Sequence, residues 1–318
     1  MTRFLLRRLG LGVLTILLAS VLVFAALQAL PGDVAGQILG RFSSPEARAA
    51  LTATLNLDQP PVQRYLSWLG GAVQGDFGTS LADGRPVVDV VWTYLRNSLL
   101  IAAVGAVLGI ALAFLLGIVA GTFREKLPDN VISVVSLVGM SVPEYTVATL
   151  LVLLLSVSIP LFPAVVTAGP TASLSELLPA VWLPGFALAV VMAAYVVRIT
   201  RSSVIDVLAS DFAVHARLRG LSTPRILVHH VLPSAILPTL NVVAVNMAWL
   251  FGGVVVVEAV FNYPGLGTLV LQSVSNRDLP VLQLVAIIGA VAYVLCNLLA
   301  DLGALALNPR LRTPAGGH

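Results

Sequence analysis

The chain has 318 residues, of which 58% are hydrophobic and only 10% are charged, and its mean hydropathy is +0.97. Soluble proteins carry about 25% charged residues, so this composition excludes an ordinary soluble fold and indicates a membrane protein. The formal net charge of +3 is small, and no nucleic-acid partner is expected. The single cysteine, Cys296, lies in an apolar run; it excludes an intrachain disulfide and is interpreted as a packed thiol.

Six apolar runs are each long enough to cross a bilayer, which requires about 20 helical residues. The runs do not alternate between apolar and polar residues, so helices are expected rather than a β-barrel. Arg7 and Arg8 precede the first run as they would in a signal peptide, but its apolar core is too long for one, and we interpret it as a retained span. The predicted spans are 9–30, 98–123, 131–158, 178–197, 236–257 and 281–307.

The distribution of arginine predicts the orientation. Basic residues concentrate at both ends of the chain and in alternate loops, whereas 159–177 has none and 258–280 has only Arg277. The positive-inside rule therefore places both termini in the cytoplasm; the five arginines of 31–97 count little because that segment is long. The predicted cytoplasmic segments are 1–8, 124–130, 198–235 and 308–318, and the predicted extracytoplasmic segments are 31–97, 159–177 and 258–280.

The first extracytoplasmic segment is expected to contain short helices. "SSPEARAALTATLNL" starts with a serine cap, a proline and a carboxylate, which is typical of a helix N-terminus. Tyr65, Leu66 and Trp68 then form an aromatic and apolar face suited to the membrane interface. Two interpretations remain open, a cap lying on the bilayer and a docking surface for an outer partner. In 258–280, Pro264 and Gly265 predict a re-entrant turn or a short surface helix.

The stretch "DFAVHARLRGLSTPRILVHHVLPSAILP" (211–238) predicts two amphipathic helices joined by a turn. Ser210 or Asp211 can cap the first helix, and Gly220 can end it. Ser222 or Thr223 can cap the second helix, with Pro224 at its first position.

The first of these two helices has distinct faces. Asp211, His215 and Arg219 are spaced four apart and share one face, while small residues such as Ala213 and Ala216 would allow a partner to approach closely. On helix physics alone, the segment could be a docking site for a soluble protein or a basic loop that only sets the topology.

Polar residues inside the spans are candidates for the substrate route. An ionised carboxylate at mid-bilayer costs roughly 2.5–3.5 kcal/mol, so Glu144 should face protein or water. It could form an interhelical hydrogen bond, or it could border the substrate route together with Asn241 or Asn246. Glycines at four-residue spacing are expected to mark close helix packing, within or between subunits: Gly105, Gly109, Gly117 and Gly121.

Nothing in the sequence indicates catalysis. A phosphate-binding loop needs Gly-Lys-Ser/Thr, yet the only lysine, Lys126, follows Glu125 and precedes Leu127. The histidines near His215 lack enough further ligands to predict a metal site. The chain is therefore not expected to be an enzyme or to hold a cofactor, and energy for transport would have to come from another chain.

Several motifs carry a family resemblance that runs nearly end to end. Gly220 followed by Leu232 and Pro233 is similar to the signature loop of ABC importer permeases. The flanking motifs resemble the peptide, dipeptide and nickel permease family: "LPGD" (30–33), "LDQPPVQRYLSWLGGAVQGDFGTSL" (57–81), "SVPEY" (141–145), "VEAVFNYPGLG" (257–267) and "NRDLPVLQ" (276–283).

This resemblance implies an all-α polytopic protein of six transmembrane helices with the type I ABC importer permease fold, located in the bacterial plasma (inner) membrane. It also implies a second homologous permease subunit, two ABC ATPase subunits that hold ATP and Mg, and an extracytoplasmic substrate-binding protein. The implied cargo is a di- or oligopeptide; a nickel chelate, haem or glutathione stays open, and so does an ion-coupled secondary transporter as a different class.

The resemblance also suggests site residues. The coupling of the ATPase to the permease would use Asp211, Phe212, His215, Ala216, Arg217, Arg219, Gly220, Leu221, Leu232 and Pro233. Candidates for the extracytoplasmic gate or the contact with the binding protein are Glu258, Phe261, Tyr263, Pro264 and Gly265.

Overall fold

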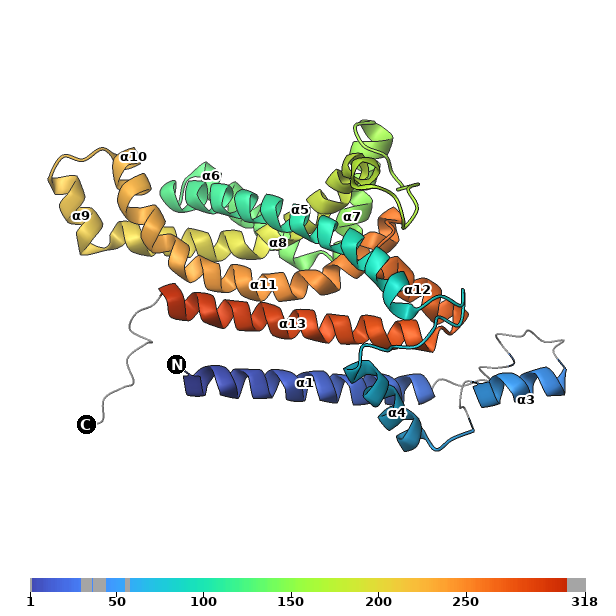
Figure 1. Ribbon diagram of the computed structural model, residues 1–318. Coiled ribbons are helices and arrows are strands. Elements are labelled where there is room, and N and C mark those ends of the chain that lie inside the picture. The colour runs from blue at the N-terminus through green and yellow to red at the C-terminus, as the bar shows by residue number, and fades with distance from the viewer. Residues whose placement is uncertain (1, 30–35, 37–43, 55–57, 308–318) are drawn as a thin grey trace. The chain divides into compact units, whose positions relative to one another are not determined.

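Helix dominates the computed structural model, which describes residues 2–29, 36, 44–54 and 58–307 (Figure 1). Two compact units can be separated, and each is described by itself. Of the described residues, the larger unit contains 98–263 and 295–307, and the smaller unit contains those between 2 and 97 together with 264–294. The predicted tail 308–318 and the motif at 30–33 lie outside the described residues.

The helices are, in chain order, α1 (Thr2–Ala29), α3 (Pro45–Thr54), α4 (Pro61–Val73), α5 (Val87–Thr122), α6 (Leu127–Ser141), α7 (Glu144–Val152), the π-helical turn η1 (Leu153–Ser158), α8 (Leu174–Ala209), α9 (Asp211–Leu218), α10 (Thr223–Ile226), the π-helical turn η2 (Leu227–Val231), α11 (Leu232–Phe261), α12 (Leu266–Asn276) and α13 (Leu279–Leu307).

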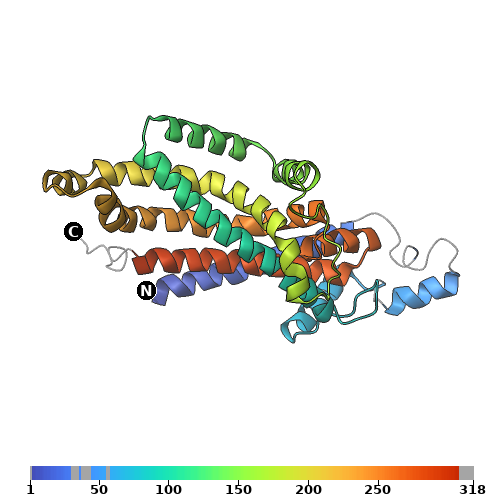
Figure 2. The same cartoon turned by 90° about the horizontal axis from the view of Figure 1, so that it is seen from above.

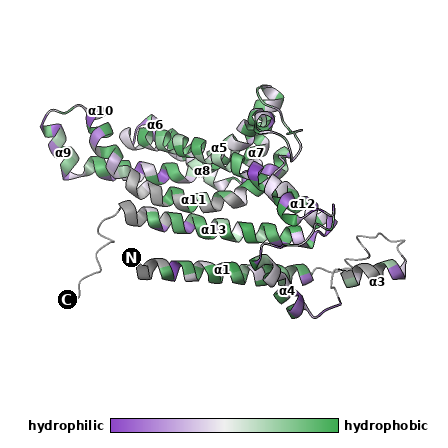
Figure 3. Ribbon diagram, viewed as in Figure 1, coloured by the Kyte–Doolittle hydropathy of each residue, from purple (hydrophilic) through white to green (hydrophobic). Residues whose placement is uncertain are grey.

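Among the described residues, four helices are long and apolar enough to cross a membrane, and the number rises to six if each of two bent helix pairs forms one span. Figure 3 shows the apolar residues that run along α5, α8 and α13, and the more frequent hydrophilic residues on α9 and α10. The helical, polytopic fold class predicted from the sequence is confirmed. The four single spans are Leu6–Ala29, Val87–Thr122, Leu174–Ala209 and Leu279–Gly303.

The predicted continuous span 131–158 is instead two helices, α6 and α7, bent by 112° at Val142 and Pro143. Proline has no N–H to donate to the preceding turn and disfavours helical backbone in the residue before it. Val142 accordingly adopts φ −91° and ψ 129°, and α7 starts afresh at Glu144. Apolarity predicted a span here, but the single proline decides its direction.

Several other helices extend beyond their predicted spans, α5 and α8 by the most. Helix α5 begins at Val87 rather than Ser98, and α8 runs to Ala209 rather than Val197. Hydropathy marks only the part of a helix that suits lipid, whereas intrahelical hydrogen bonds continue through polar residues such as Arg201. The polar ends of these helices therefore belong to the same rigid elements as their spans.

The core of the larger unit surrounds α8, which runs beside α11 in both views (Figures 1 and 2). Helices α6 and α7 also pack on α8. The spanning part of α5 approaches α8 through its glycines: a Cβ added at Gly117 would lie 2.5 Å from Thr200 Cβ, and one at Gly121 would lie 2.7 Å from Val204 Cβ. The predicted close packing at these glycines thus occurs within the subunit.

In the smaller unit, α4 lies against α1. The Ser20 and Tyr65 hydroxyls share a hydrogen bond of 2.7 Å, and the Phe24 ring meets the edge of Tyr65 at a centroid distance of 5.3 Å. A second cluster joins the start of α5 to α12 and α13 through Val87, Leu269 and Val285.

Candidate functional site

The coupling segment, defined as residues 210–233, begins at a single residue between two helices. Ser210 has extended backbone (φ −67°, ψ 150°), and its carbonyl accepts the Val214 N–H at 3.1 Å, which starts α9. Its hydroxyl does not cap α9 as predicted; it donates to the Val207 carbonyl at 2.6 Å. The same carbonyl accepts the Ser210 N–H at 3.2 Å, so backbone and side chain of Ser210 together close the end of α8.

The turn after α9 depends on Gly220. Its φ of +76° lies in the left-handed region that glycine occupies without steric cost. The Gly220 N–H donates to the Arg217 carbonyl at 2.9 Å, and the Leu221 N–H donates to the Ala216 carbonyl at 3.3 Å, which closes the helix end. The predicted stop of the first helix is therefore confirmed.

One face of α9 is buried inside the chain. Ala213 (0% exposed) and Ala216 (7%) pack in a cluster with Val204 of α8 and with Ile226 and Val231. This corrects the expectation that both alanines would be open to a partner: their small size lets α9 fold back onto its own chain. Within the coupling segment, Leu221 and Leu232 are partly buried.

The rest of α9 is exposed and carries both apolar and charged side chains. Phe212 is 56% exposed and Leu218 is 78% exposed. The other predicted coupling residues with exposed side chains are Asp211, His215, Arg217, Arg219 and Pro233. A short helix anchored on one side, with exposed apolar and charged side chains elsewhere, can receive force from a docked protein.

Glu144 lies at the start of α7 with its carboxylate against α11. Its Oε2 is buried and has no hydrogen-bond partner among the described residues. A Cβ added at Gly253 would lie 2.6 Å from Oε2, so this glycine makes the room that the carboxylate occupies. A buried acceptor without a donor is costly, so the site would gain from a ligand, a water molecule or a proton.

Asn246, one of the two predicted asparagines, is not brought to this carboxylate. Asn246 lies seven residues before Gly253 on the same face of α11, about 10 Å along the axis. Its side-chain amide donates to the Val242 carbonyl at 2.8 Å, one turn back on its own helix. The side chain of Asn241 lies outside the described part of the structure.

The predicted gate or contact residues at the end of α11 are inside the fold. Glu258, Phe261 and Tyr263 are each 0% exposed, and Pro264 and Gly265 are buried. The Ser98 hydroxyl donates to Glu258 Oε1 at 2.5 Å. The expectation of direct contact with a binding protein is corrected for this state of the chain, because fully buried side chains cannot touch a docked protein.

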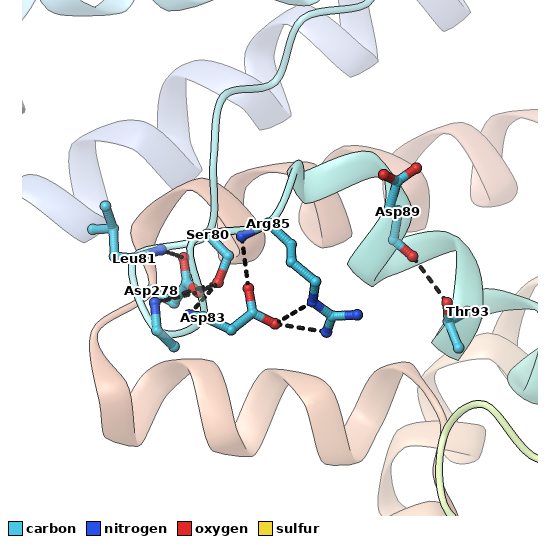
Figure 4. Close-up of polar contacts among 8 residues, drawn as sticks. Ser80, Leu81, Asp83, Arg85, Asp89, Thr93 and Asp278 are labelled. Carbon is cyan, nitrogen blue, oxygen red and sulfur yellow. Dashed lines mark hydrogen bonds and ion pairs between the residues drawn. The ribbon is translucent and has the colours of Figure 1, made fainter.

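A polar network around Asp278 was not predicted from the sequence. Its carboxylate accepts the Ser80 hydroxyl and the backbone N–H groups of Leu81 (3.1 Å) and Ala82 (3.3 Å) (Figure 4). Asp278 is 2% exposed and precedes α13, so it ties the 80–82 turn to the start of that helix. The pairing joins residues almost 200 positions apart, which local sequence rules do not reach.

Beside this turn, Arg85 and Asp83 form an exposed pair (Figure 4). Arg85 Nε and Nη2 donate to Asp83 Oδ2 at 2.8 and 2.6 Å. Burial acts to raise the pKa of Asp83, but the hydrogen bonds from Arg85 outweigh it, and the pKa of Asp83 is lowered.

A second unpredicted ion pair joins α6 to α8. Arg201 Nε and Nη2 donate to the two Asp129 carboxylate oxygens at 2.5 and 2.8 Å, and Asp129 is 1% exposed. A cavity of about 350 Å³ lies beside the pair and includes Ser133, Met140 and Arg198 in its lining. Neither Glu144 nor Asn246 is among its lining residues. From the sequence, Arg201 counted only as one of the basic residues that predict the membrane orientation, and its pairing with Asp129 was not predicted.

Comparison with known proteins covers both halves of the chain. Residues 113–313 match the family described as "Binding-protein-dependent transport system inner membrane component", and residues 1–98 match its N-terminal component. The glutathione transport system permease protein GsiC of Escherichia coli (strain K12) is 35% identical over 306 residues, covering 96% of this chain and 97% of the relative. GsiC of Shigella flexneri serotype 5b (strain 8401) is 34% identical with the same coverage.

Solved structures are similar in fold. A crystal structure of an amino acid ABC transporter with histidines matches with a TM-score of 0.52 and 18% identity, covering 69% of this chain and 94% of that chain. An inward-facing structure of the MetNI methionine ABC transporter also has a TM-score of 0.52 and 18% identity, covering 70% and 96%. This chain belongs to the family of inner-membrane components of binding-protein-dependent transport systems, and is a multi-pass permease subunit of a bacterial ABC importer.

Proposed function

We propose that this permease imports short peptides, with glutathione as one candidate cargo. Support for this cargo class comes from the GsiC relatives, which are described as glutathione transport permeases and align over nearly their whole length. Peptides and glutathione share amide bonds and charged ends, which a path with a few polar groups in an apolar wall can recognise. Import of radiolabelled glutathione and dipeptides by the reconstituted complex would identify the cargo.

The proposed complex contains a second, homologous permease subunit, two ATPase subunits and a substrate-binding protein. ATP and Mg would bind to the ATPase subunits, and this chain would hold no cofactor. Both termini and the coupling segment would face the cytoplasm, as the arginine distribution predicts. The membership of the chain in a family of binding-protein-dependent permeases supports the need for ATPase and binding-protein partners.

The observation that carries the coupling proposal is the two-sided packing of α9. Its inner face is anchored through Ala213 and Ala216, while Phe212 and Leu218, like the other side chains that form its outer face, are exposed. Force applied to the outer face would pass through the anchored face to α8, because α9 and α8 are separated only by Ser210. We assign ATPase docking to this outer face together with Asp211, His215, Arg217 and Arg219.

Replacing Gly220 by proline tests this coupling. Proline fixes φ near −65° and lacks the N–H that donates to Arg217, so it cannot form the turn that ends α9. We expect Gly220→Pro to abolish cargo-stimulated ATP hydrolysis and import in the reconstituted complex, while membrane insertion is unchanged.

The matched control is Gly75→Pro, because Gly75 has φ +85° and donates its N–H to the Ala72 carbonyl at the end of α4. It should keep the stimulated ATPase activity. Import by Gly220→Pro at the wild-type rate would refute the coupling role of the segment.

We further propose that Glu144 borders the substrate route. Its buried carboxylate oxygen has no donor among the described residues, and an incoming peptide amine or amide could supply one. We include Asn246 and Asn241 in this proposal as further residues that would border the substrate route.

For the end of α11, we propose an indirect role. Glu258, Phe261, Tyr263, Pro264 and Gly265 would hold the chain that leads into α12 in place, and the exposed residues nearby would meet the binding protein.

A further inference from the structure

The smaller unit contains a cavity of about 450 Å³ that the transport proposal does not use. Its walls come from the C-terminal half of α1, from α4, from the 76–81 turn and from the start of α13. A volume of this size falls within the range of small-molecule sites in proteins. Polar side chains in its lining include Gln28, Arg64, Ser67, Trp68, Asp76 and Gln283.

Arg64 brings a positive charge into this cavity without a carboxylate partner among the described residues. Its Nη1 donates to Gln28 Oε1 at 3.0 Å, which is a neutral acceptor. Burial lowers the pKa of Arg64, as expected for a guanidinium that has lost part of its hydration. A partly desolvated cation with no carboxylate partner in the described part of the chain would be stabilised by an anion.

Trp68 adds a second donor on the same face of α4, four residues after Arg64. Its indole N–H is buried and finds no acceptor in the part of the chain that the structure describes. Buried tryptophan N–H groups usually have a hydrogen-bond partner, so the absence of one beside a cavity points to an acceptor that occupies it. Asp76 also lines the cavity, but its Oδ1 accepts the Gly78 N–H at 2.9 Å.

The position of the cavity along the α1 span follows from where α4 contacts α1. Tyr65 of α4 contacts Ser20, which precedes the end of α1 at Ala29 by about 13 Å of helix. Helix α4 therefore lies beside the span rather than beyond its end. Its other face exposes Val62 (70%) and Leu66 (60%), which are apolar side chains suited to acyl chains.

We propose that this cavity binds the phosphate group of a phospholipid, with Arg64 and the Trp68 N–H as its donors. The phosphate would sit in the cavity, and the acyl chains would lie along exposed apolar residues of α1 such as Leu18 and Leu22. The proposed topology places this lipid in the extracytoplasmic leaflet. The choice of leaflet therefore rests on the proposed function, but the phosphate site itself does not depend on it. A soluble anion lacks the acyl chains that the neighbouring apolar surface can cover.

The test uses the purified full-length chain in mild detergent, with phosphatidylglycerol added and the retained lipid measured by native mass spectrometry. We expect Arg64→Gln to reduce retention about tenfold or more, as expected for the loss of a hydrogen-bonded charge contact. Trp68→Phe should also reduce retention, and Arg64→Lys should restore part of it.

Arg85→Gln is the matched control, because it removes the same charge from the same segment at a side chain that is 56% exposed and outside the cavity. It should retain lipid as the wild type does. Thermal unfolding of each variant in the same detergent separates loss of the site from loss of the fold; if Arg64→Gln does not fold, Trp68→Phe decides the outcome.

A parallel titration follows tryptophan fluorescence with inorganic phosphate, with a dipeptide and with phosphatidylglycerol micelles. A response to phosphatidylglycerol that is lost in Trp68→Phe supports the proposal. Wild-type lipid retention by both Arg64→Gln and Trp68→Phe, or a Trp68-dependent response to the dipeptide or to phosphate alone, would overturn it.

Discussion

At the scale of single residues, the absence of a side chain at Gly253 decides where Glu144 can lie. The carboxylate fills the space that a Cβ would occupy, at the start of a helix that Pro143 has redirected. Taken singly, the glycine, the glutamate and the proline are each common in membrane-spanning segments or at their ends, and none of them predicts this site. Together they create a buried acceptor that lacks a donor among the described residues, and this is why Glu144 is the stronger of the substrate-route candidates.

We predict that Glu144→Ala lowers import by about tenfold, the loss expected when one buried hydrogen bond to a charged group is removed. Transport of cargo into proteoliposomes would measure it, with assembly of the complex checked by gel filtration. Glu125→Gln, at an exposed carboxylate (77%), serves as the control and should transport normally. Normal import by Glu144→Ala would leave Glu144 with a packing role only.

Gly117 illustrates a packing constraint at the same scale. We predict that Gly117→Ala destabilises the larger unit by about 1–3 kcal/mol, because the new methyl would overlap the rigid Cβ of Thr200. Thermal unfolding in detergent measures this, and Gly289→Ala, where no atom lies within 4 Å of the added Cβ, is the control. Equal stability of the two variants would contradict the close approach of α5 to α8.

At the scale of elements, the ion pair between Asp129 and Arg201 connects α6 to the centre of the larger unit. Asp129 also accepts the Glu125 N–H at 2.8 Å and the Ser133 hydroxyl at 3.1 Å, so the turn before α6 and its first two turns share one anchor. The connection holds α6, the first helix of the bent pair, and α7, the second, packs on the same helix α8. The relation between α6 and α7 therefore depends on their separate attachment to α8.

We predict that Asp129→Asn destabilises the chain by about 2 kcal/mol, a value between those of exposed and buried pairs because Arg201 remains 29% exposed. The double variant Asp129→Asn with Arg201→Gln should be more stable than the sum of the two single changes predicts. Denaturation of all four proteins in detergent gives this coupling energy. Strictly additive losses would mean that the pair contributes no interaction of its own.

At the scale of the whole molecule, the chain is one subunit of a larger assembly, and its family excludes the ion-coupled secondary transporter that composition alone left open. Under the proposed function, force reaches the spans through α9. The exposed apolar residues of α9 would then contact the ATPase, and this contact should contribute to the stability of the complex.

We predict that the wild-type chain co-purifies in mild detergent with two ATPase subunits and a second six-span permease. Leu218→Asp should reduce the yield of the ATPase chains by roughly fivefold, the effect of removing one apolar contact from an interface centre. Leu127→Asp, at a similarly exposed leucine (76%) outside α9, is the control. Undiminished ATPase recovery with Leu218→Asp would place the docking surface elsewhere.

The sequence by itself determined features that depend on residues within a few turns of one another. Apolar run length predicted the helical membrane class, and the left-handed preference of glycine predicted the end of α9 at Gly220. The motifs also identified the family, because their order and spacing are written directly in the chain.

Tertiary structure alone decided which side chains are buried and which pairs meet. Ala213 and Tyr263 read as surface candidates in the sequence, yet packing buries both. Asp129 pairs with Arg201 across 72 positions, and no local rule could select that partner from the other arginines. Periodicity describes one helix at a time, whereas burial and pairing depend on which helices pack together, and apolar spans provide several faces that could do so.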